Sequence, residues 1–196
     1  MEALTAPKLT LPPAEAATVR AAYAEARVIL EYGSGGSTLI AGENPAATVF
    51  SVESDAAWAE MMRAWFAANP AKARVHLHHA DIGPTKEWGM PANGRKARQW
   101  PGYPNSVWDR ADFLQPDTVL IDGRFRLACF LTVLFRTAAP VRVLWDDYAD
   151  RSGYHLAERL CRPAAHHGRM AEFHVERQTL AANDLPWVTE AFVTPQ

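Results

Sequence analysis

The chain has 196 residues, of which 48% are hydrophobic and 21% are charged. These are the values of an ordinary globular protein, and the length suits one well-cored domain better than two. The formal net charge of −2 excludes a strong electrostatic attraction to nucleic acid or to an anionic membrane as the main mode of action.

The sequence has no segment typical of membrane insertion or secretion. Residues 1–13 lack the apolar segment of a signal peptide, and the longest nearly apolar run, residues 127–135, is too short to cross a bilayer. The two cysteines, Cys129 and Cys161, do not have the spacing of metal ligands and suit a reducing compartment. We therefore expect a soluble cytoplasmic protein that consists of one domain, residues 1–196, and binds neither membranes nor nucleic acids.

Predicted strands and helices alternate along the chain. Residues 1–27 predict a helical lead, because residues 14–26 are rich in alanine. Apolar or alternating runs predict strands at residues 28–32, 48–52, 74–80, 117–121, 141–145, 171–176 and 187–193. Helical patterns follow at residues 39–41, 54–68, 125–137 and 152–160. This alternation predicts an α/β fold with a mostly parallel sheet and helices on both faces.

The helix predicted at residues 54–68 carries a stripe of large apolar side chains. They recur three and four residues apart, at Trp58, Met61, Met62, Trp65 and Phe66. Such a stripe is typical of the buried face of a helix. We therefore interpret it as core rather than as part of a ligand site.

The first predicted strand runs directly into a glycine-rich bend, Gly33-Ser34-Gly35-Gly36. Glycine between a strand and a helix lets the backbone approach a ligand closely. The second predicted strand ends at Glu53, twenty residues after Gly33, where a carboxylate can accept hydrogen bonds from ribose hydroxyls. These features predict a nucleoside-binding βαβ unit.

Residues 83–115 interrupt the regular pattern with closely spaced turn signals. Their aromatic residues, Trp88, Trp100, Tyr103 and Trp108, argue against simple disorder. Long insertions in compact domains usually serve a function. We interpret this insertion as a lid or an acceptor-binding segment, and the alternative is a solvated basic loop that its aromatic residues hold in place.

Acidic residues occur where the predicted strands one to five end. They are Glu31, Glu53, Asp81, Asp122 and the pair Asp146-Asp147. In an open parallel sheet, ligands bind beyond the carboxyl ends of the strands. Helix capping explains one such acid but not five. We therefore expect these residues to converge on one cleft.

Together these features resemble the class I S-adenosylmethionine-dependent methyltransferases, over roughly residues 28–193, with Glu31-Tyr32-Gly33-Ser34-Gly35-Gly36-Ser37 as the first motif. The resemblance implies a Rossmann-like, doubly wound sheet of seven strands with the last one antiparallel. It implies that Glu53 binds the cofactor ribose and that Asp81 accepts a hydrogen bond from the adenine amine. The full set of implied cofactor-binding residues is Glu31, Gly33, Ser34, Gly35, Ser37, Thr38, Glu53, Ser54, Asp81, Ile82 and Asp122.

The segments around residues 119–126 and 144–148 look like the O-methyltransferase branch of that superfamily. The resemblance implies a catalytic set on the acceptor side, namely Asp122, Arg124, Asp146 and Asp147. In cation-dependent members such acids bind a divalent metal, so Mg²⁺ held by Asp122, Asp146 and Asp147 is one hypothesis. Another is a general base created by carboxylates that share a proton. The third is that Asp122 and Asp146 only cap helices and order Arg124.

Two arginines follow the fourth predicted strand. Arg124 could bind an anionic acceptor through two hydrogen bonds, whereas the helical periodicity directs Arg126 elsewhere. The function predicted is S-adenosylmethionine-dependent O-methylation of a small hydroxyl- or carboxyl-bearing molecule. The sequence leaves the oligomeric state open, including a homodimer.

Two other functions, of different classes, are alternatives to methyl transfer. One is a non-catalytic binding module that keeps the methyltransferase fold. The other is an NAD-dependent enzyme, which lacks support because Thr38 stands where a third glycine is needed. Moreover, no tyrosine has a lysine four residues further on.

Overall fold

The computed structural model describes residues 5–195 and contains one seven-stranded sheet with the order β3-β2-β1-β6-β7-β9-β8. Its strands are β1 Val28–Tyr32, β2 Thr48–Glu53, β3 Arg74–His79, β6 Thr118–Ile121, β7 Val141–Trp145, β8 Ala165–His167 and β9 Met170–Val175. β1, β2, β3, β6 and β7 pair in parallel, and β9 runs antiparallel to both of its neighbours. The sequence prediction of a Rossmann-like sheet with its last strand antiparallel is confirmed.

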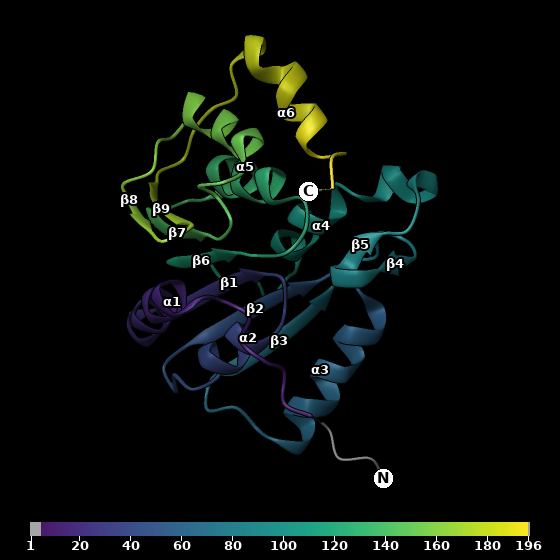
Figure 1. The fold of residues 1–196 in the computed structure, drawn as a ribbon, viewed down its shortest axis with the longest axis vertical. Coiled ribbons are helices and arrows are strands. Elements are labelled where there is room, and N and C mark those ends of the chain that lie inside the picture. Colours follow the sequence, from purple (N-terminus) through teal and green to yellow (C-terminus); the bar gives the residue numbers. More distant parts are fainter. Residues whose placement is uncertain (1–4, 196) are drawn as a thin grey trace.

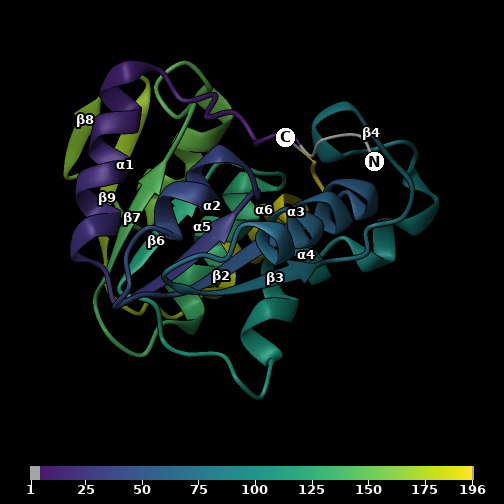
Figure 2. The ribbon, with the colours of Figure 1, turned by 90° about the horizontal axis from the view of Figure 1, so that it is seen from below.

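Helices cover both faces of this sheet, as Figures 1 and 2 show. They are α1 Pro13–Glu25, α2 Gly36–Ala41, α3 Ala56–Ala68, α4 Gly102–Asn105, α5 Arg126–Arg136 and α6 Leu185–Ala191. In Figure 1, α1, α2 and α3 lie below the sheet, and α4, α5 and α6 lie above it. This two-sided cover is the expected consequence of parallel strands that are joined by helical crossovers.

The core consists of one layer on each side of the sheet. Successive side chains of a strand point to opposite faces, so Ile29 packs in the layer under α1 and α2 while Leu30 packs in the layer under α5. Nine of the eleven residues of α5 are buried, among them Phe130, which stacks on Trp145 and Phe173. The aromatic cluster fixes the ends of β7 and β9 relative to α5.

The strand predicted at residues 187–193 is wrong, because this segment belongs to α6. Val188 and Ala191 are its buried residues, and their spacing of three matches one helical face rather than a pleated strand. Pro186 at the start of α6 is also suited to a first helical turn. The seventh strand is instead β8, which forms a tight hairpin with β9 around Gly168.

Residues 83–115 fold into short elements rather than one loop. These are β4 Thr85–Lys86, β5 Met90–Pro91, and the 3₁₀ turns η1 Glu87–Gly89, η2 Gly94–Gln99 and η3 Ser106–Asp109. Further 3₁₀ turns are η4 Ser152–Arg159 and η5 Ala182–Asp184. Trp100 and Tyr103 are buried in the core beside Phe125, whereas Trp88 is 77% exposed. The C-terminal half of the insertion is therefore anchored in the core, whereas its N-terminal half exposes Trp88.

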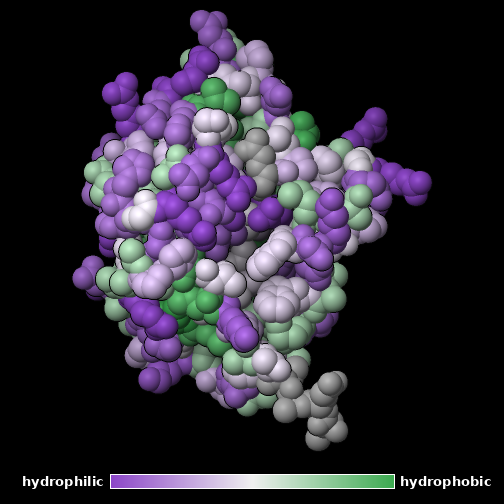
Figure 3. All heavy atoms as spheres, viewed as in Figure 1, coloured by the Kyte–Doolittle hydropathy of each residue, from purple (hydrophilic) through white to green (hydrophobic). Residues whose placement is uncertain are grey.

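The surface is mixed in character. Figure 3 shows that hydrophilic side chains predominate on the face seen in Figure 1, with a hydrophobic area beside α1 and α2. Between residues 5 and 195, every helix is too short or too polar to cross a membrane.

Candidate active site

At the bend between β1 and α2, three segments of the chain lie close together. Gly33 has φ +101°, and a Cβ added there would lie 2.8 Å from the Cα of Gly123, which follows β6. A Cβ on Gly36 would collide with the backbone of Leu9 in the N-terminal segment. Only glycine tolerates the positive φ of Gly33 together with such close neighbours. The bend therefore forms one edge of a cavity beside it.

Glu53, at the end of β2, is held in one orientation by backbone amides. Its Oε1 accepts hydrogen bonds from the N–H groups of Ser54 (2.7 Å) and Asp55 (2.8 Å), and its Oε2 accepts one from Ser34 (3.3 Å). Burial raises the pKa of Glu53, and these amides counteract that rise. The carboxylate is thus pre-positioned beside the glycine bend, only 8% exposed.

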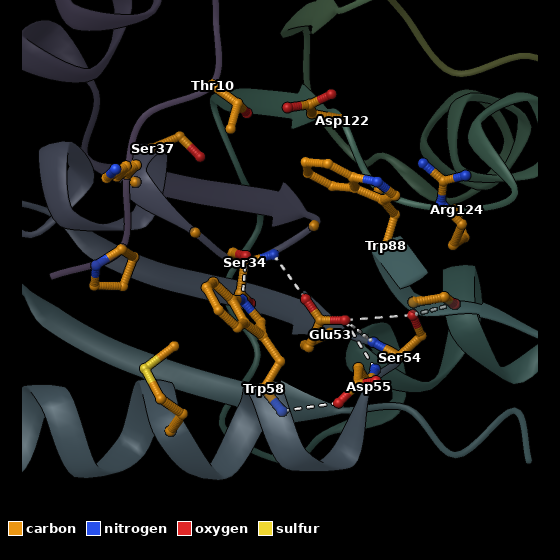
Figure 4. A pocket seen from close by; sticks show the side chains of 18 of the residues that line it. Thr10, Ser34, Ser37, Glu53, Ser54, Asp55, Trp58, Trp88, Asp122 and Arg124 are labelled. Carbon is orange, nitrogen blue, oxygen red and sulfur yellow. Dashed lines mark hydrogen bonds between the residues drawn. The ribbon is translucent and has the colours of Figure 1, made fainter. Parts of the chain in front are cut away.

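A cavity of about 890 Å³ lies over the bend and Glu53. Residues from distant parts of the chain surround it (Figure 4), including residues 5–11, 33–37, 53–55 and 86–89. The indole Nε1 of Trp58 donates to the carbonyl of Ser34 (2.8 Å), and Trp58 and Met61 of α3 line the wall. The interpretation of the stripe on α3 as core is therefore wrong for these two residues and right for Met62, which is buried.

A second cavity of about 750 Å³ adjoins the first. Trp88, Asp122 and Arg124 line both cavities, so they stand at the boundary. The second cavity is rich in cationic side chains, namely Lys86, Arg124, Arg126, Arg151 and Arg169. Its acidic lining residues are Glu87, Asp122 and Asp147.

Asp122 combines this boundary position with an unusual protonation equilibrium. Its Oδ1 lies 3.0 Å from the Arg126 guanidinium, and its side chain is 22% exposed. Burial, together with the nearby Asp146 and Asp147, raises the pKa of Asp122 to about 7, against the opposing effect of Arg126. A carboxylate with this pKa can accept a proton near neutral pH.

Arg126 joins the ends of β6 and β7. Its guanidinium donates to the carbonyls of Gly123 (3.0 Å), Asp122 (3.0 Å) and Asp146 (2.8 Å). The side chain is only 4% exposed. Helical periodicity was expected to point Arg126 elsewhere than Arg124, yet Arg126 also lines the second cavity. α5 begins at this residue after the left-handed Phe125 (φ 51°). That turn directs the first helical side chain back to the sheet edge.

Asp146 and Asp147 face arginines rather than an open metal site. Asp146 is completely buried and accepts two hydrogen bonds from Arg169, at 3.1 and 2.7 Å. Asp147 pairs with Arg126 (3.3 Å), Arg151 (2.8 Å) and Arg169 (3.0 Å). Over residues 5–195 no group of three His, Cys, Asp or Glu side chains is arranged to hold a metal ion. The expected Mg²⁺ site does not fit this charge pairing, and Asp146 does not reach either cavity in the described structure.

The expected cofactor-binding residues divide into two groups. Those that line the first cavity are Gly33, Ser34, Gly35, Ser37, Glu53, Ser54 and Asp122. Those that lie outside its described lining are Glu31, Thr38, Asp81 and Ile82. The sheet edge thus brings most of the set together.

Glu31 and Thr38 form a buried network beneath the bend. The Glu31 carboxylate accepts hydrogen bonds from Tyr23 (3.1 Å), Ser51 (2.8 Å) and Thr38. Burial raises the pKa of Glu31, and the surrounding hydroxyl groups counteract that rise. These residues support the bend from behind and do not contact the cavity.

Asp81 and Ile82 belong to the turn after β3. Asp81 is exposed, and its Oδ1 accepts a hydrogen bond from the N–H of Gly83 (2.9 Å). Ile82 is buried, and its carbonyl accepts one from Trp100 (3.1 Å). Neither residue lines the first cavity, so their contact with the adenine stays a prediction.

Comparison with known proteins gives a match over nearly the whole chain. A methyltransferase-like protein from Silicibacter pomeroyi is 48% identical, and the alignment covers 97% of this chain and 99% of that one with a TM-score of 0.93. The chain belongs to the class I S-adenosylmethionine-dependent methyltransferases. Neither a family model nor a curated protein matches the sequence.

More distant solved methyltransferases share the fold alone. A methyltransferase from Geobacter sulfurreducens is 11% identical over 85% of this chain and 80% of that one, with a TM-score of 0.55. An O-methyltransferase from Bacillus cereus, in complex with SAH, is 16% identical over 80% and 64%, with a TM-score of 0.51.

Several residues that line the candidate site were missed from sequence. They are residues 5–11, Trp58, Met61, Arg151 and Arg169. Trp58 had a usable signal, because the N-cap Asp55 places the first turn of α3 at the carboxyl end of β2. Arg151 and Arg169 had none, since they follow no motif and reach the site only through the fold of η4 and the β8–β9 hairpin.

Proposed function

We propose that this chain is an S-adenosylmethionine-dependent methyltransferase that methylates an oxygen of a small acceptor. The observation that carries the proposal is Asp122, a carboxylate with a pKa of about 7 at the boundary of two adjoining cavities. One cavity has the glycine bend and the ordered Glu53 expected for a nucleoside. The other has room for the acceptor.

On the cofactor side, Glu53 would bind the ribose hydroxyls, and the bend at Gly33–Gly35 would run beneath the methionine part. Trp58 and Met61 would supply apolar surface for the base. S-adenosylmethionine supplies, when bound, a methyl group on a positively charged sulfur. Methyl transfer from such a sulfonium is an in-line displacement, so the protein chiefly aligns the two reactants and excludes water.

On the acceptor side, Asp122 would take the proton of the attacking hydroxyl group. The new bond forms between that oxygen and the methyl carbon while the carbon–sulfur bond breaks, and the electron pair of that bond stays on sulfur. The hydroxyl proton passes to a carboxylate oxygen of Asp122 and then to solvent. Arg126 holds this carboxylate in place at 3.0 Å.

The proposal is tested by calorimetric titration and by a methyl-transfer assay. S-adenosylmethionine and S-adenosylhomocysteine should bind, and NAD should not. An assay of S-adenosylhomocysteine release over small phenols, hydroxy acids and sugars should identify acceptors, with no requirement for Mg²⁺ because arginines neutralise the carboxylates. Binding without transfer to any acceptor would favour the non-catalytic alternative, and absence of nucleoside binding would refute both.

A further inference from the structure

Arg124 differs from the other arginines that line the second cavity. Arg126, Arg151 and Arg169 each lie within 3.3 Å of at least one aspartate oxygen. For Arg124, residues 5–195 supply no such carboxylate, and its buried Nε has no hydrogen-bond partner there. Figure 4 shows Arg124 among the side chains that line the first cavity.

The main chain fixes Arg124 while its charged end is left without a partner. Its N–H donates to the hydroxyl group of Tyr103 (3.3 Å), and its carbonyl accepts from Cys129 (3.4 Å). Burial and the neighbouring Arg126 lower the pKa of Arg124, yet a guanidinium remains protonated in proteins. Buried donors without partners are rare and call for an explanation. A bound anion supplies one, because it would balance the charge of the guanidinium that Arg124 presents at the cavity.

The charges around Arg124 indicate which of the two reactants would carry the anion. Cationic residues outnumber acidic ones by five to three in the lining of the second cavity. The first cavity already has a separate cation near the bend, Lys8. Asp122 and Arg124 both line the boundary of the two cavities, so an acceptor in the second cavity would meet both residues.

We propose that the acceptor is a small hydroxy acid, whose carboxylate binds Arg124 while its hydroxyl group faces Asp122. This inference rests on the proposed function and adds the substrate class to it. The planar guanidinium matches the two oxygens of a carboxylate. A neutral analogue of the same shape leaves the Arg124 guanidinium unpaired, so it binds less tightly.

The test uses benzoate and its neutral isostere benzamide as probes. Each is titrated into the S-adenosylhomocysteine-saturated protein and, separately, into the protein alone. We expect benzoate to bind at least about tenfold more tightly than benzamide. R124Q should lose this preference, and R124K, which keeps the charge, should retain part of it. R20Q, a change at an exposed arginine of α1, should behave as wild type.

Three outcomes overturn the inference. The first is equal binding, or no binding, of the two probes by the wild-type protein. The second is an unchanged preference in R124Q. The third is a loss of tenfold or more in S-adenosylhomocysteine affinity in folded R124Q, which would assign Arg124 to the carboxylate of the cofactor. Failure of the proposed function looks different, because the wild-type protein would then bind no S-adenosylhomocysteine while the titrations without cofactor still report on Arg124.

Discussion

The two adjoining cavities are built in different ways. One wall of the first is shaped by local backbone, because the bend at Gly33 and the amides that follow Glu53 lie within a few residues of their strand ends. The wall of the second is rich in long charged side chains from separate segments, among them Lys86 of β4, Arg151 just before η4 and Arg169 of the β8–β9 hairpin. The first is thus suited to a ligand of fixed shape, and the second sets its preference through charge. Substitutions should separate the two roles.

The largest effect is expected for D122N, which removes the base from the boundary. Loss of general base catalysis should lower turnover of an acceptor found in the assay by about 10²–10⁴-fold. Affinity for S-adenosylhomocysteine, measured by calorimetry, should change by less than about threefold, because Glu53 and the bend remain. D150N, at an exposed aspartate of the same region, is the matched control. Turnover above a tenth of wild type in D122N would contradict the assignment.

The pH dependence of turnover should follow the same group. The pKa of Asp122 is about 7, so the carboxyl group is increasingly protonated as the pH falls below that value and cannot accept the hydroxyl proton. We expect kcat to decrease by about tenfold per pH unit below pH 7 and to level off above it. Initial rates between pH 5.5 and 9 measure this, and a flat profile for the wild-type enzyme would exclude Asp122 as the base.

The first cavity is probed by E53Q. The amide keeps the shape of the side chain but replaces one acceptor oxygen by a donor that faces backbone N–H groups. We expect the Kd for S-adenosylhomocysteine to rise by about tenfold. Calorimetry on E53Q and on the exposed-site control E43Q measures this, with thermal unfolding to check that E53Q is folded. An unchanged Kd would place the ribose elsewhere.

The smallest effect is expected away from both cavities, at Glu172 on β9. Although burial opposes it, hydrogen bonds from Arg142, His167 and His174 hold the pKa of Glu172 at about 2. The depressed pKa stabilises the fold above the ordinary value near 4.5, and this contribution is lost as the pH falls from there towards 2.

We therefore expect E172Q to lower the free energy of unfolding by about 1–2 kcal/mol at pH 7, a value reduced for solvent screening of the partly exposed partners. The difference from wild type should shrink at pH 3. Urea denaturation at both pH values measures it, and affinity for S-adenosylhomocysteine should stay the same. A larger deficit at pH 3 than at pH 7 would reverse the expected sign.

The elements expected from the sequence are present where a local pattern decides the structure. Strand periodicity, the glycines at 33–36 and the N-cap Asp55 all act within one or two turns of chain, and the structure shows the expected elements there. The strand expected at residues 187–193 is wrong, because alternation of apolar side chains and helical spacing coincide over these seven residues. Burial against α5 decided in favour of the helix.

For the site, the sequence alone determined the bend, the acid after each parallel strand and therefore the sheet edge at which they gather. Only the tertiary structure decided which of these acids face a cavity. Asp146 lies buried against Arg169, Glu31 supports the bend from behind, and Asp122 alone of the three lines both cavities. The reason is that a strand end fixes where a side chain starts, whereas its partners come from segments distant in sequence, and ion pairing with those segments sets its direction and its protonation.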